Sequence, residues 1–377
     1  MKILLVIDQF DDDNNGTTMT ARRLFDTLIK HGHQVRVVST GRNEEYKYRV
    51  PEYRLIPVVK QIIKGQGMTI AKPKEEVLAE AVKWAELVHF VMPFFISMKG
   101  LAIVEKEGVP HTAAFHVQPE NITYTLGLGR VKWINDMIYK YFNRHFYSAF
   151  SHIHCPSRFI ASQLEEHDYQ AKLHVISNGV NPDFVYRKHS KTKELEGKFV
   201  ILTIGRLSNE KRQDLLIEAV KKSRYSDKIQ LILAGQGLKK HKYEKRGKEL
   251  WHRPIIRFYS HDELLHILAM SDLYVHAADA EIEAIACIEA LSSGLVPVIA
   301  DSPKSATPQF ALDERSLFKA GSSSSLAQKI DYWIEHEAER KEAEHTYSES
   351  GRCYDLDHCV GEMEKMFQEA MHDKGKQ

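Results

Sequence analysis

The chain has 377 residues, of which 43% are hydrophobic and 27% are charged, and its formal net charge at pH 7 is +1. This length allows two domains of ordinary size, each with its own core. A net charge so close to zero excludes a strong overall field for nucleic acid, so no nucleic-acid partner is expected and an anionic partner needs a local basic patch. The apolar runs are too short to predict a secretory signal or a membrane span. The four cysteines lack metal-ligand spacing and indicate reduced thiols in a cytoplasmic protein.

The first half of the chain alternates short apolar runs with segments of helical periodicity. The predicted strands are 3–7, 34–39, 54–58, 87–91, 112–115 and 152–155. The predicted helices are 17–30, 75–84 and 157–167. This alternation is typical of a parallel sheet with helices on both faces.

Two places in the first half carry candidate site residues. The segment DQFDDDNNGTTMTARRLF (8–25) joins the first strand to the first helix, and Gly16 within it can adopt a positive φ. His116 ends the strand in AAFHVQPENITY (113–124). Ligands of open α/β sheets bind at such strand ends, although a histidine there is more often structural.

A second series of strands begins near residue 199. Its predicted strands are 199–204, 229–233, 255–258, 273–276 and 296–300. The segment 177–198 is rich in turn formers and charge and is interpreted as a linker, while 355–372 has the pattern of an amphipathic helix. The sequence therefore predicts an α/β protein with doubly wound domains at 1–177 and 178–354, followed by a terminal segment at 355–377.

Two cations follow the first strand of the second series. In ILTIGRLSNEKRQDLLIEAV (201–220), Gly205 ends the strand, and Arg206 and Lys211 precede a helix. A glycine at a strand end lets the backbone approach a ligand closely. Two cations near one helix start suit a diphosphate. A solvated basic loop is the alternative interpretation.

The next strand repeats this arrangement more weakly. It runs into LAGQG (233–237), which contains Gly235 and Gly237. A single Gly-x-Gly is more often a plain turn than a ligand site. The strand after it ends at Arg257-Phe258-Tyr259.

Two glutamates eight residues apart are the most informative feature of the chain. In VHAADAEIEAIACIEALSSGLVPVIA (275–300), a strand and a polar loop lead into a helix whose first amides can bind an anion. If Glu281 and Glu289 are both helical, their carboxylates lie on the same side of the helix. A carboxylate accepts hydrogen bonds from neighbouring hydroxyls, which suits a sugar nucleotide. Solvated glutamates are the alternative, but the helix is otherwise almost wholly apolar, and buried glutamates need a partner.

These motifs resemble those of the retaining glycosyltransferases related to glycogen and sucrose synthases, glycosyltransferase family 4, including bacterial diacylglycerol glucosyltransferases. The resemblance rests on the GR…EK pattern at 205–211 and on the two glutamates, which Ser293-Gly294 and Pro297-Val298 follow. It covers nearly the whole chain. It implies the GT-B fold, in which two Rossmann-like domains face a central cleft and a final helix crosses back onto the first domain.

The resemblance also implies roles for individual residues. Arg206 and Lys211 would hold the donor diphosphate and stabilise the departing charge, Glu281 and His116 would lie at the transferred sugar, and Glu289 would hold the ribose. The implied donor-binding residues are Gly16, Gly205, Gly235, Gly237, Phe258, Ala284, Ile285 and Glu289. The implied acceptor-binding residues are Gln118, Glu120 and Tyr124.

The chain departs from the family pattern in two places. Asn15-Gly16 stands where relatives often have Gly-Gly. Glu283-Ala284 stands where they commonly have Phe-Gly after the first glutamate. An additional carboxylate near the donor could alter the sugar preference.

Two basic segments are candidates for contact with a membrane. Residues 54–74 contain five lysines or arginines and no acid, and 130–150 mixes four cations with aromatic residues. Basic-aromatic segments favour anionic interfaces. For 130–150, a core helix with its aromatic side chains turned inward fits the pattern equally well.

The sequence hypothesis is a retaining glycosyltransferase that moves a hexose, with UDP-glucose as the first choice of donor, to a membrane lipid such as diacylglycerol. No cofactor and no metal is expected, because Arg206 and Lys211 would take the charge that a metal otherwise neutralises. The protein is expected in the cytoplasm, with peripheral contact to the inner face of an anionic membrane. The alternatives are a soluble or polysaccharide acceptor and a non-catalytic sugar-nucleotide-binding protein. A dinucleotide-dependent oxidoreductase is disfavoured, because the first turn lacks Gly-x-Gly-x-x-Gly.

Overall fold

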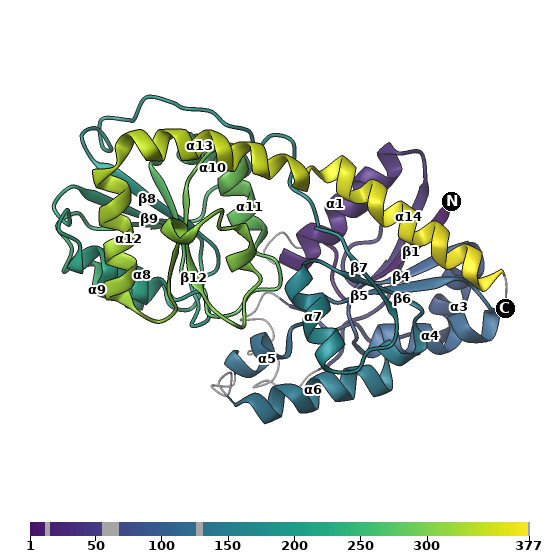
Figure 1. Ribbon diagram of the computed structural model, residues 1–377. Coiled ribbons are helices and arrows are strands. Elements are labelled where there is room, and N and C mark those ends of the chain that lie inside the picture. Colours follow the sequence, from purple (N-terminus) through teal and green to yellow (C-terminus); the bar gives the residue numbers. More distant parts are fainter. Residues whose placement is uncertain (12–15, 55–67, 126–130, 376–377) are drawn as a thin grey trace. The chain divides into compact units, whose positions relative to one another are not determined.

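The computed structural model describes residues 1–11, 16–54, 68–125 and 131–375. The chain divides into two compact units (Figure 1). Unit 1 comprises Met1–Gly179 and Leu356–Gln377, and unit 2 comprises Val180–Asp355. Each unit contains a parallel sheet with helices packed against it.

Among the described residues, seven parallel strands form the sheet of unit 1 in the order β3-β2-β1-β4-β5-β6-β7. Their bounds are β1 Lys2–Val6, β2 Gln34–Ser39, β3 Lys47–Arg49, β4 Leu87–Phe90, β5 His111–Ala114, β6 His152–Cys155 and β7 Lys172–Val175. The strands β4 and β6 are buried along their whole length, as a parallel sheet covered on both faces requires. The strand order reverses between β1 and β4, and ligands of open sheets bind near the carboxyl ends of strands at such a point.

The helices of unit 1 cover both faces of this sheet. They are α1 Gly16–Lys30, α3 Glu75–Trp84, α4 Phe95–Glu107, α5 Pro119–Thr125, α6 Lys132–His145, the 3-10 turn η1 Tyr147–Ala149, α7 Arg158–Glu166 and α14 Leu356–Lys374. The hydroxyl of Ser157 caps α7 by accepting from the amide of Ile160, and α4 ends at Gly108, which is left-handed. The last helix, α14, packs beside α1 and against β5 and β6, as its yellow ribbon shows in Figure 1.

Unit 2 has a parallel sheet of six strands in the order β10-β9-β8-β11-β12-β13. Their bounds are β8 Phe199–Ile204, β9 Ile229–Ala234, β10 Ile255–Arg257, β11 Leu273–His276, β12 Pro297–Asp301 and β13 Leu317–Lys319. The helices and 3-10 turns are α8 Gln213–Lys222, α9 Lys240–Gly247, α10 His261–Met270, α11 Ile285–Ser292, η2 Thr307–Phe310, η3 Glu314–Ser316, α12 Ser323–Glu335, α13 Glu337–Gly351 and η4 Arg352–Tyr354. The strand order reverses between β8 and β11, so the loops after these two strands are placed to bind a ligand together.

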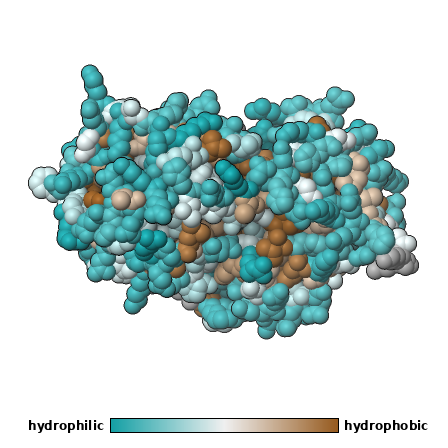
Figure 2. Space-filling view, turned by 45° about the horizontal axis from the view of Figure 1, so that its top comes forward, coloured by the Kyte–Doolittle hydropathy of each residue, from teal (hydrophilic) through white to brown (hydrophobic). Residues whose placement is uncertain are grey.

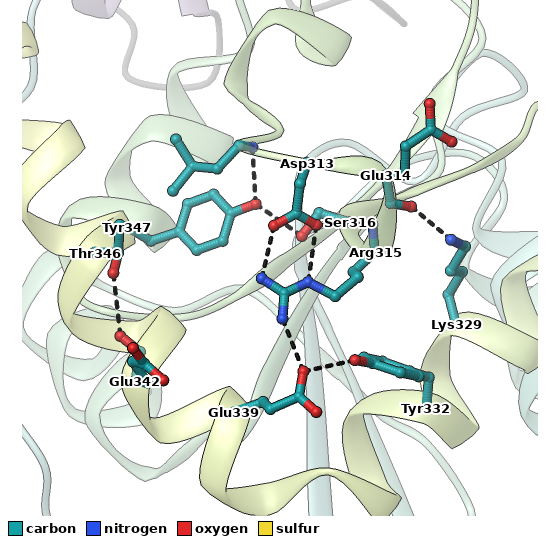
Figure 3. Close-up of polar contacts among 11 residues, drawn as sticks. Asp313, Glu314, Arg315, Ser316, Lys329, Tyr332, Glu339, Glu342, Thr346 and Tyr347 are labelled. Carbon is teal, nitrogen blue, oxygen red and sulfur yellow. Dashed lines mark hydrogen bonds and ion pairs between the residues drawn. The ribbon is translucent and has the colours of Figure 1, made fainter.

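A polar network ties the β13 edge of this sheet to α12 and α13 (Figure 3). The guanidinium of Arg315 donates to both carboxylate oxygens of Asp313, at 3.0 and 2.7 Å, and to Glu339 at 2.8 Å. The hydroxyl of Tyr332 donates to the same oxygen of Glu339 at 2.6 Å. Bidentate arginine–carboxylate pairs are geometrically specific. This network therefore positions α13 relative to α12.

The predicted elements agree with the observed sheets in most places. The predicted strand 54–58 lies almost wholly outside the described residues. The strands β3, β7 and β13 were not predicted. Most of the segment interpreted as a linker is packed on unit 2, because Lys188 pairs with Glu344 at 2.9 Å and Lys191 pairs with Asp272 at 2.5 Å.

The surface seen in Figure 2 is largely hydrophilic and carries separate hydrophobic patches. Within the described part of the chain, every helix is too short or too polar to cross a lipid bilayer.

Candidate active site

The loops after β8 and β9 in unit 2 pack closely because they contain glycines. A Cβ on Gly235 would lie 2.0 Å from the carbonyl oxygen of Gly205, and a Cβ on Gly237 would lie 2.6 Å from that of Leu207. The amide of Gly205 donates to Ala234 at 3.0 Å. Gly205 and Gly237 also have φ values of 148° and 156°, which glycine adopts most readily. The glycines singled out in the sequence therefore hold two strand-end loops together.

Lys211, Glu281 and His276 form a charged cluster near the carboxyl ends of β8 and β11. The ammonium of Lys211 contacts Oε1 of Glu281, and Nε2 of His276 lies 3.2 Å from the same oxygen. The Lys211 and Glu281 side chains are only 19% and 12% exposed. The side chain of Lys211 also lies against Gly205, since a Cβ there would be 3.8 Å from the ammonium. The cluster thus joins the loop after β8 to the loop after β11.

The charges in this cluster follow from its burial and its contacts. Burial alone raises the pKa of Glu281, but the charge of Lys211 and the contact with His276 lower it to about 2. Burial lowers the pKa of His276, against the opposing effect of Glu281. In the ring of His276, Nε2 lies on the side of Glu281, while Nδ1 lies 3.1 Å from the hydroxyl of Tyr274. Glu281 is therefore ionised and held by a cation and a neutral ring.

His276 was not singled out in the sequence. It is the last residue of β11 and is almost fully buried. His276 could have been predicted as His116 was, because it stands at the carboxyl end of a strand. The contact with Glu281 could not be inferred, because it depends on the path of the loop that follows β11.

The two glutamates do not share a helix, which corrects the geometry inferred from their spacing. Glu281 forms an isolated bridge with Ser305, and α11 begins only at Ile285. Glu289 lies within α11 and is buried. The helix starts late because Ala284 is left-handed, with φ 66° and ψ 63°. A left-handed residue cannot continue a right-handed helix.

The amino-terminal end of α11 presents amides without intrahelical acceptors. Ala284 precedes the helix and Ile285 is its first residue. The first amides of any α-helix lack partners within the helix and carry partial positive charge. Ala284 and Ile285, both implied donor-binding residues, therefore lie where the loop that carries Glu281 joins α11.

Arg206 and Phe258 are more accessible than the cluster. The guanidinium of Arg206 donates to Glu210 at 3.3 Å, and its side chain is 41% exposed. Phe258 follows β10 and is exposed, whereas its neighbour Tyr259 is buried beneath the guanidinium of Arg257 at 4.0 Å. A partly exposed cation and an exposed aromatic ring after strand ends can bind a phosphate and a base.

In unit 1, His116 lies among other buried histidines. It follows β5, and its ring is 5.4 Å from that of His154, edge to face. Both rings and that of His89 line a cavity of about 20 Å³ under α1 and α14, which is about the size of one or two water molecules. Burial and the two neighbouring histidines lower the pKa of His116 well below its usual value. His116 is therefore a neutral ring.

The residues implied for the acceptor are mostly buried. Gln118 and Glu120 are buried, and the hydroxyl of Tyr139 on α6 lies 3.4 Å from the carboxylate of Glu120. Tyr124, near the end of α5, is half-buried. Gly16 is the first residue of α1 and is exposed, rather than part of a left-handed turn. Of this group, Gly16 and Tyr124 offer the most accessible surface.

Two protein-family models match the chain. The model of Glycosyltransferase Family 4 matches residues 14–184, and the model of Glycosyl transferases group 1 matches residues 186–352. Together they cover most of both units.

Two curated relatives match over most of the chain. The alpha-monoglucosyldiacylglycerol synthase of Streptococcus pneumoniae is 23% identical over 80% of this chain and 71% of its own length. The GDP-mannose-dependent alpha-mannosyltransferase of Mycolicibacterium smegmatis is 25% identical over 80% of this chain and 79% of its own.

Solved structures share the fold. A sucrose-phosphate synthase from Thermosynechococcus elongatus superposes with a TM-score of 0.77 at 14% identity and covers 98% of both chains. The predicted α/β fold with two parallel-sheet units is thereby confirmed. The chain belongs to the glycosyltransferases of the family 4 type, which have the GT-B fold and transfer a sugar from a donor.

Proposed function

We propose that the protein is a retaining glycosyltransferase that moves glucose from UDP-glucose to a membrane lipid such as diacylglycerol. The observation that carries the proposal is the buried cluster of Lys211, Glu281 and His276 beside the first amides of α11. Such a cluster supplies a cation for a diphosphate and an ionised carboxylate for sugar hydroxyls.

Each residue of the cluster has a distinct part in this proposal. Lys211 and Arg206 bind the diphosphate and stabilise the negative charge that develops on it as the sugar leaves. Glu281 accepts hydrogen bonds from the transferred sugar, and Glu289 accepts those of the ribose. His276 holds the Glu281 carboxylate in place without adding a second positive charge. The two cations take the role that a metal ion has in other transferases, so activity should persist in excess chelator.

The identity of the donor is the first point to test. The names of the two relatives differ in the sugar, one being a glucosyl and the other a mannosyl enzyme. UDP-glucose, UDP-galactose, UDP-N-acetylglucosamine and GDP-mannose should be compared by thermal shift and by turnover. A ligand at about 100 times its dissociation constant stabilises by about 2.7 kcal/mol, so UDP-glucose should give the largest shift. A larger shift with GDP-mannose would replace glucose by mannose in the proposal.

The outer face of α6 supports a lipid acceptor. Trp133, Met137 and Tyr141 are spaced four residues apart and are 66%, 56% and 52% exposed. The cations Lys140 and Arg144 lie on the same face of the helix and are exposed. The aromatic residues of the segment 130–150 therefore divide into an outward group and an inward group. The inward group consists of Tyr139, Phe142, Phe146, Tyr147 and Phe150.

An exposed face of aromatic and basic side chains suits an anionic lipid surface. The Streptococcus pneumoniae relative is named for a diacylglycerol product, which agrees with this acceptor class. The second basic segment, 54–74, lies largely outside the described residues, including Lys60 and Lys64. Lys132 is paired with Asp136 at 2.9 Å, so Lys140 and Arg144 are the better cations to test.

Vesicle sedimentation tests the lipid surface. The wild-type protein should bind vesicles of anionic phospholipid at low salt and leave them at molar salt. The double variant Lys140→Glu/Arg144→Glu should lose this binding but keep donor hydrolysis. Trp133→Gln should weaken it, whereas Trp251→Gln, which changes a 75% exposed tryptophan of unit 2, serves as the matched control. A wild-type protein that ignores vesicles yet glycosylates a soluble acceptor would instead establish the soluble-acceptor alternative.

A further inference from the structure

Three side chains with metal-ligating atoms converge in unit 1, and none of them belongs to the motifs of the transferase site. His152 comes from β6, His174 from β7 and Glu369 from α14. One ligand atom from each lies within 4.8 Å of the other two. Nδ1 of His152 is 3.0 Å from Nε2 of His174, which is 3.9 Å from Oε2 of Glu369. Glu369 is 195 positions after His174 in the sequence, and the packing of α14 brings it to the two histidines.

The strand register explains why the two histidines meet. In the parallel pair β6 and β7, His152 lies opposite Lys172 and His154 lies opposite His174. Side chains two residues apart on a strand point to the same face, so all four share one face of the sheet. The helix α14 packs against β6 and brings Glu369 to this face.

A further carboxylate orients His152. Oδ2 of Asp373, one turn beyond Glu369, lies 3.1 Å from Nε2 of His152, whose side chain is only 3% exposed. A carboxylate accepts a hydrogen bond, so the ring carries its proton on Nε2 and turns the Nδ1 lone pair toward His174. Metal-bound histidines commonly have such a carboxylate on their second nitrogen, where it fixes the tautomer.

A neutral His174 offers a nitrogen lone pair to a metal ion. In the absence of a metal, an N–H of His174 pointing at Nδ1 of His152 accounts for the 3.0 Å separation.

We propose that His152, His174 and Glu369 bind a divalent transition-metal ion, for which Zn²⁺ is the best match, and that Asp373 is a positioning residue. Two imidazoles and a carboxylate are a zinc ligand set, with water in the fourth position. With Zn–N bonds of 2.0–2.1 Å, the nitrogens of a tetrahedral site lie about 3.3 Å apart, close to the 3.0 Å found here. The bound ion fastens the last turns of α14 to β6 and β7.

Lys172 competes with the metal for one of its ligands. Its ammonium is 2.5 Å from Oε2 of Glu369, and its side chain is 59% exposed. Binding of the ion requires this ammonium to turn into the solvent, which costs little for an exposed lysine. Removing the lysine should therefore strengthen metal binding.

Zinc titration of the full-length protein, first freed of metal by chelator and dialysis, tests the site. Calorimetry should give one site per chain, and Co²⁺ should give the visible absorption of a tetrahedral centre. The variants His174→Gln and Glu369→Gln should weaken Zn²⁺ binding at least 10-fold, Asp373→Asn should weaken it 10- to 100-fold, and Lys172→Gln should tighten it. The matched control is His31→Gln, because His31 contacts Glu364 of the same helix at 2.8 Å.

Two results would overturn the proposal. Equal Zn²⁺ affinity in the wild type and in the double variant His174→Gln/Glu369→Gln would show that these residues hold no metal. Hydrogen exchange of α14 that is unchanged by saturating Zn²⁺ would remove the fastening role. Substitution of the buried His152 is avoided because it can disturb folding, and circular dichroism should confirm that the surface variants are folded.

Discussion

Each unit has histidine near the ends of parallel strands, but the groups of side chains around it differ in charge. In unit 2, His276 stands beside the ion pair of Lys211 and Glu281. In unit 1, His89 and His154 are deeply buried with His116, and burial lowers their pKa values to about 3 and about 4. The group in unit 2 keeps permanent charges in a site that is only slightly exposed to solvent, which suits an anionic diphosphate. The group in unit 1 is neutral and can only exchange hydrogen bonds, which suits hydroxyl groups.

Loss of the cation in unit 2 should have the largest effect. Lys211→Ala should lower turnover by about 100-fold or more, because it removes a charge that stabilises the leaving diphosphate. The same change leaves the buried carboxylate of Glu281 without its ammonium and should lower the melting temperature. Steady-state kinetics and thermal unfolding measure the two effects.

Variants of Arg206 and Lys221 separate the loss of turnover from the loss of stability. Arg206→Ala should reduce turnover to a similar extent without the loss of stability, since its side chain is 41% exposed. Lys221→Ala removes an exposed lysine of α8 that pairs with Glu249, and it should change neither quantity. Near-normal turnover in both site variants would exclude the assignment of the diphosphate to these cations.

The two glutamates should separate catalysis from binding. Glu281→Gln should reduce turnover by about tenfold or more while UDP affinity changes little, because this carboxylate is proposed to contact the sugar. Glu289→Gln should mainly weaken UDP, because it is proposed to hold the ribose. Calorimetry with UDP and initial rates with the sugar nucleotide give the comparison. An equal loss of UDP affinity in both variants would contradict the division.

As the pH falls, unit 1 should lose stability at a higher pH than the charged cluster of unit 2. The buried His89 has a pKa of about 3, below the value of about 6.5 in an unfolded chain. Its contribution to stability is therefore present above pH 6.5 and is lost as the pH falls below it, by up to about 2 kcal/mol at pH 5. For Glu281, with a pKa of about 2, the contribution is present above about pH 4.5 and is lost only between there and pH 2.

Thermal unfolding between pH 7 and pH 5 checks this order. His89→Gln should reduce the loss of melting temperature over this range. An equal change of melting temperature with pH in the wild type and in His89→Gln would contradict the role given to the neutral histidine.

The smallest expected effect concerns Ala284, which is left-handed at the start of α11. A left-handed conformation costs a residue with a Cβ about 1–2 kcal/mol. Ala284→Gly should therefore raise the free energy of unfolding by up to about 1 kcal/mol, after the entropy cost of glycine is subtracted. Ala286→Gly, two residues later and inside α11, should instead lower it by about 0.5–1 kcal/mol. Denaturant unfolding distinguishes the two, and a destabilised Ala284→Gly would contradict the strain.

The sequence was sufficient to predict the features that depend on a local pattern of residues. Alternation of strands and helices predicted two parallel sheets, and this fold class is confirmed. The short strand β7 was missed because its residues are polar or only partly buried, and its place at the end of the sheet is set by its pairing with β6. The predicted domain ends at 177 and 354 compare with unit boundaries after Gly179 and Asp355.

The tertiary structure decided which side chains meet. The sequence by itself determined that Gly205 follows a strand and that Lys211 and Glu281 lie between a strand and the next helix, because strand and helix periodicity can be read along the chain. It could not show that His276 supports Glu281, or that α11 begins four residues after Glu281. Likewise, the pattern of 130–150 could not divide its aromatic residues between the core and the surface. Contacts of this kind depend on the paths of loops and on packing between distant elements, which no local pattern contains.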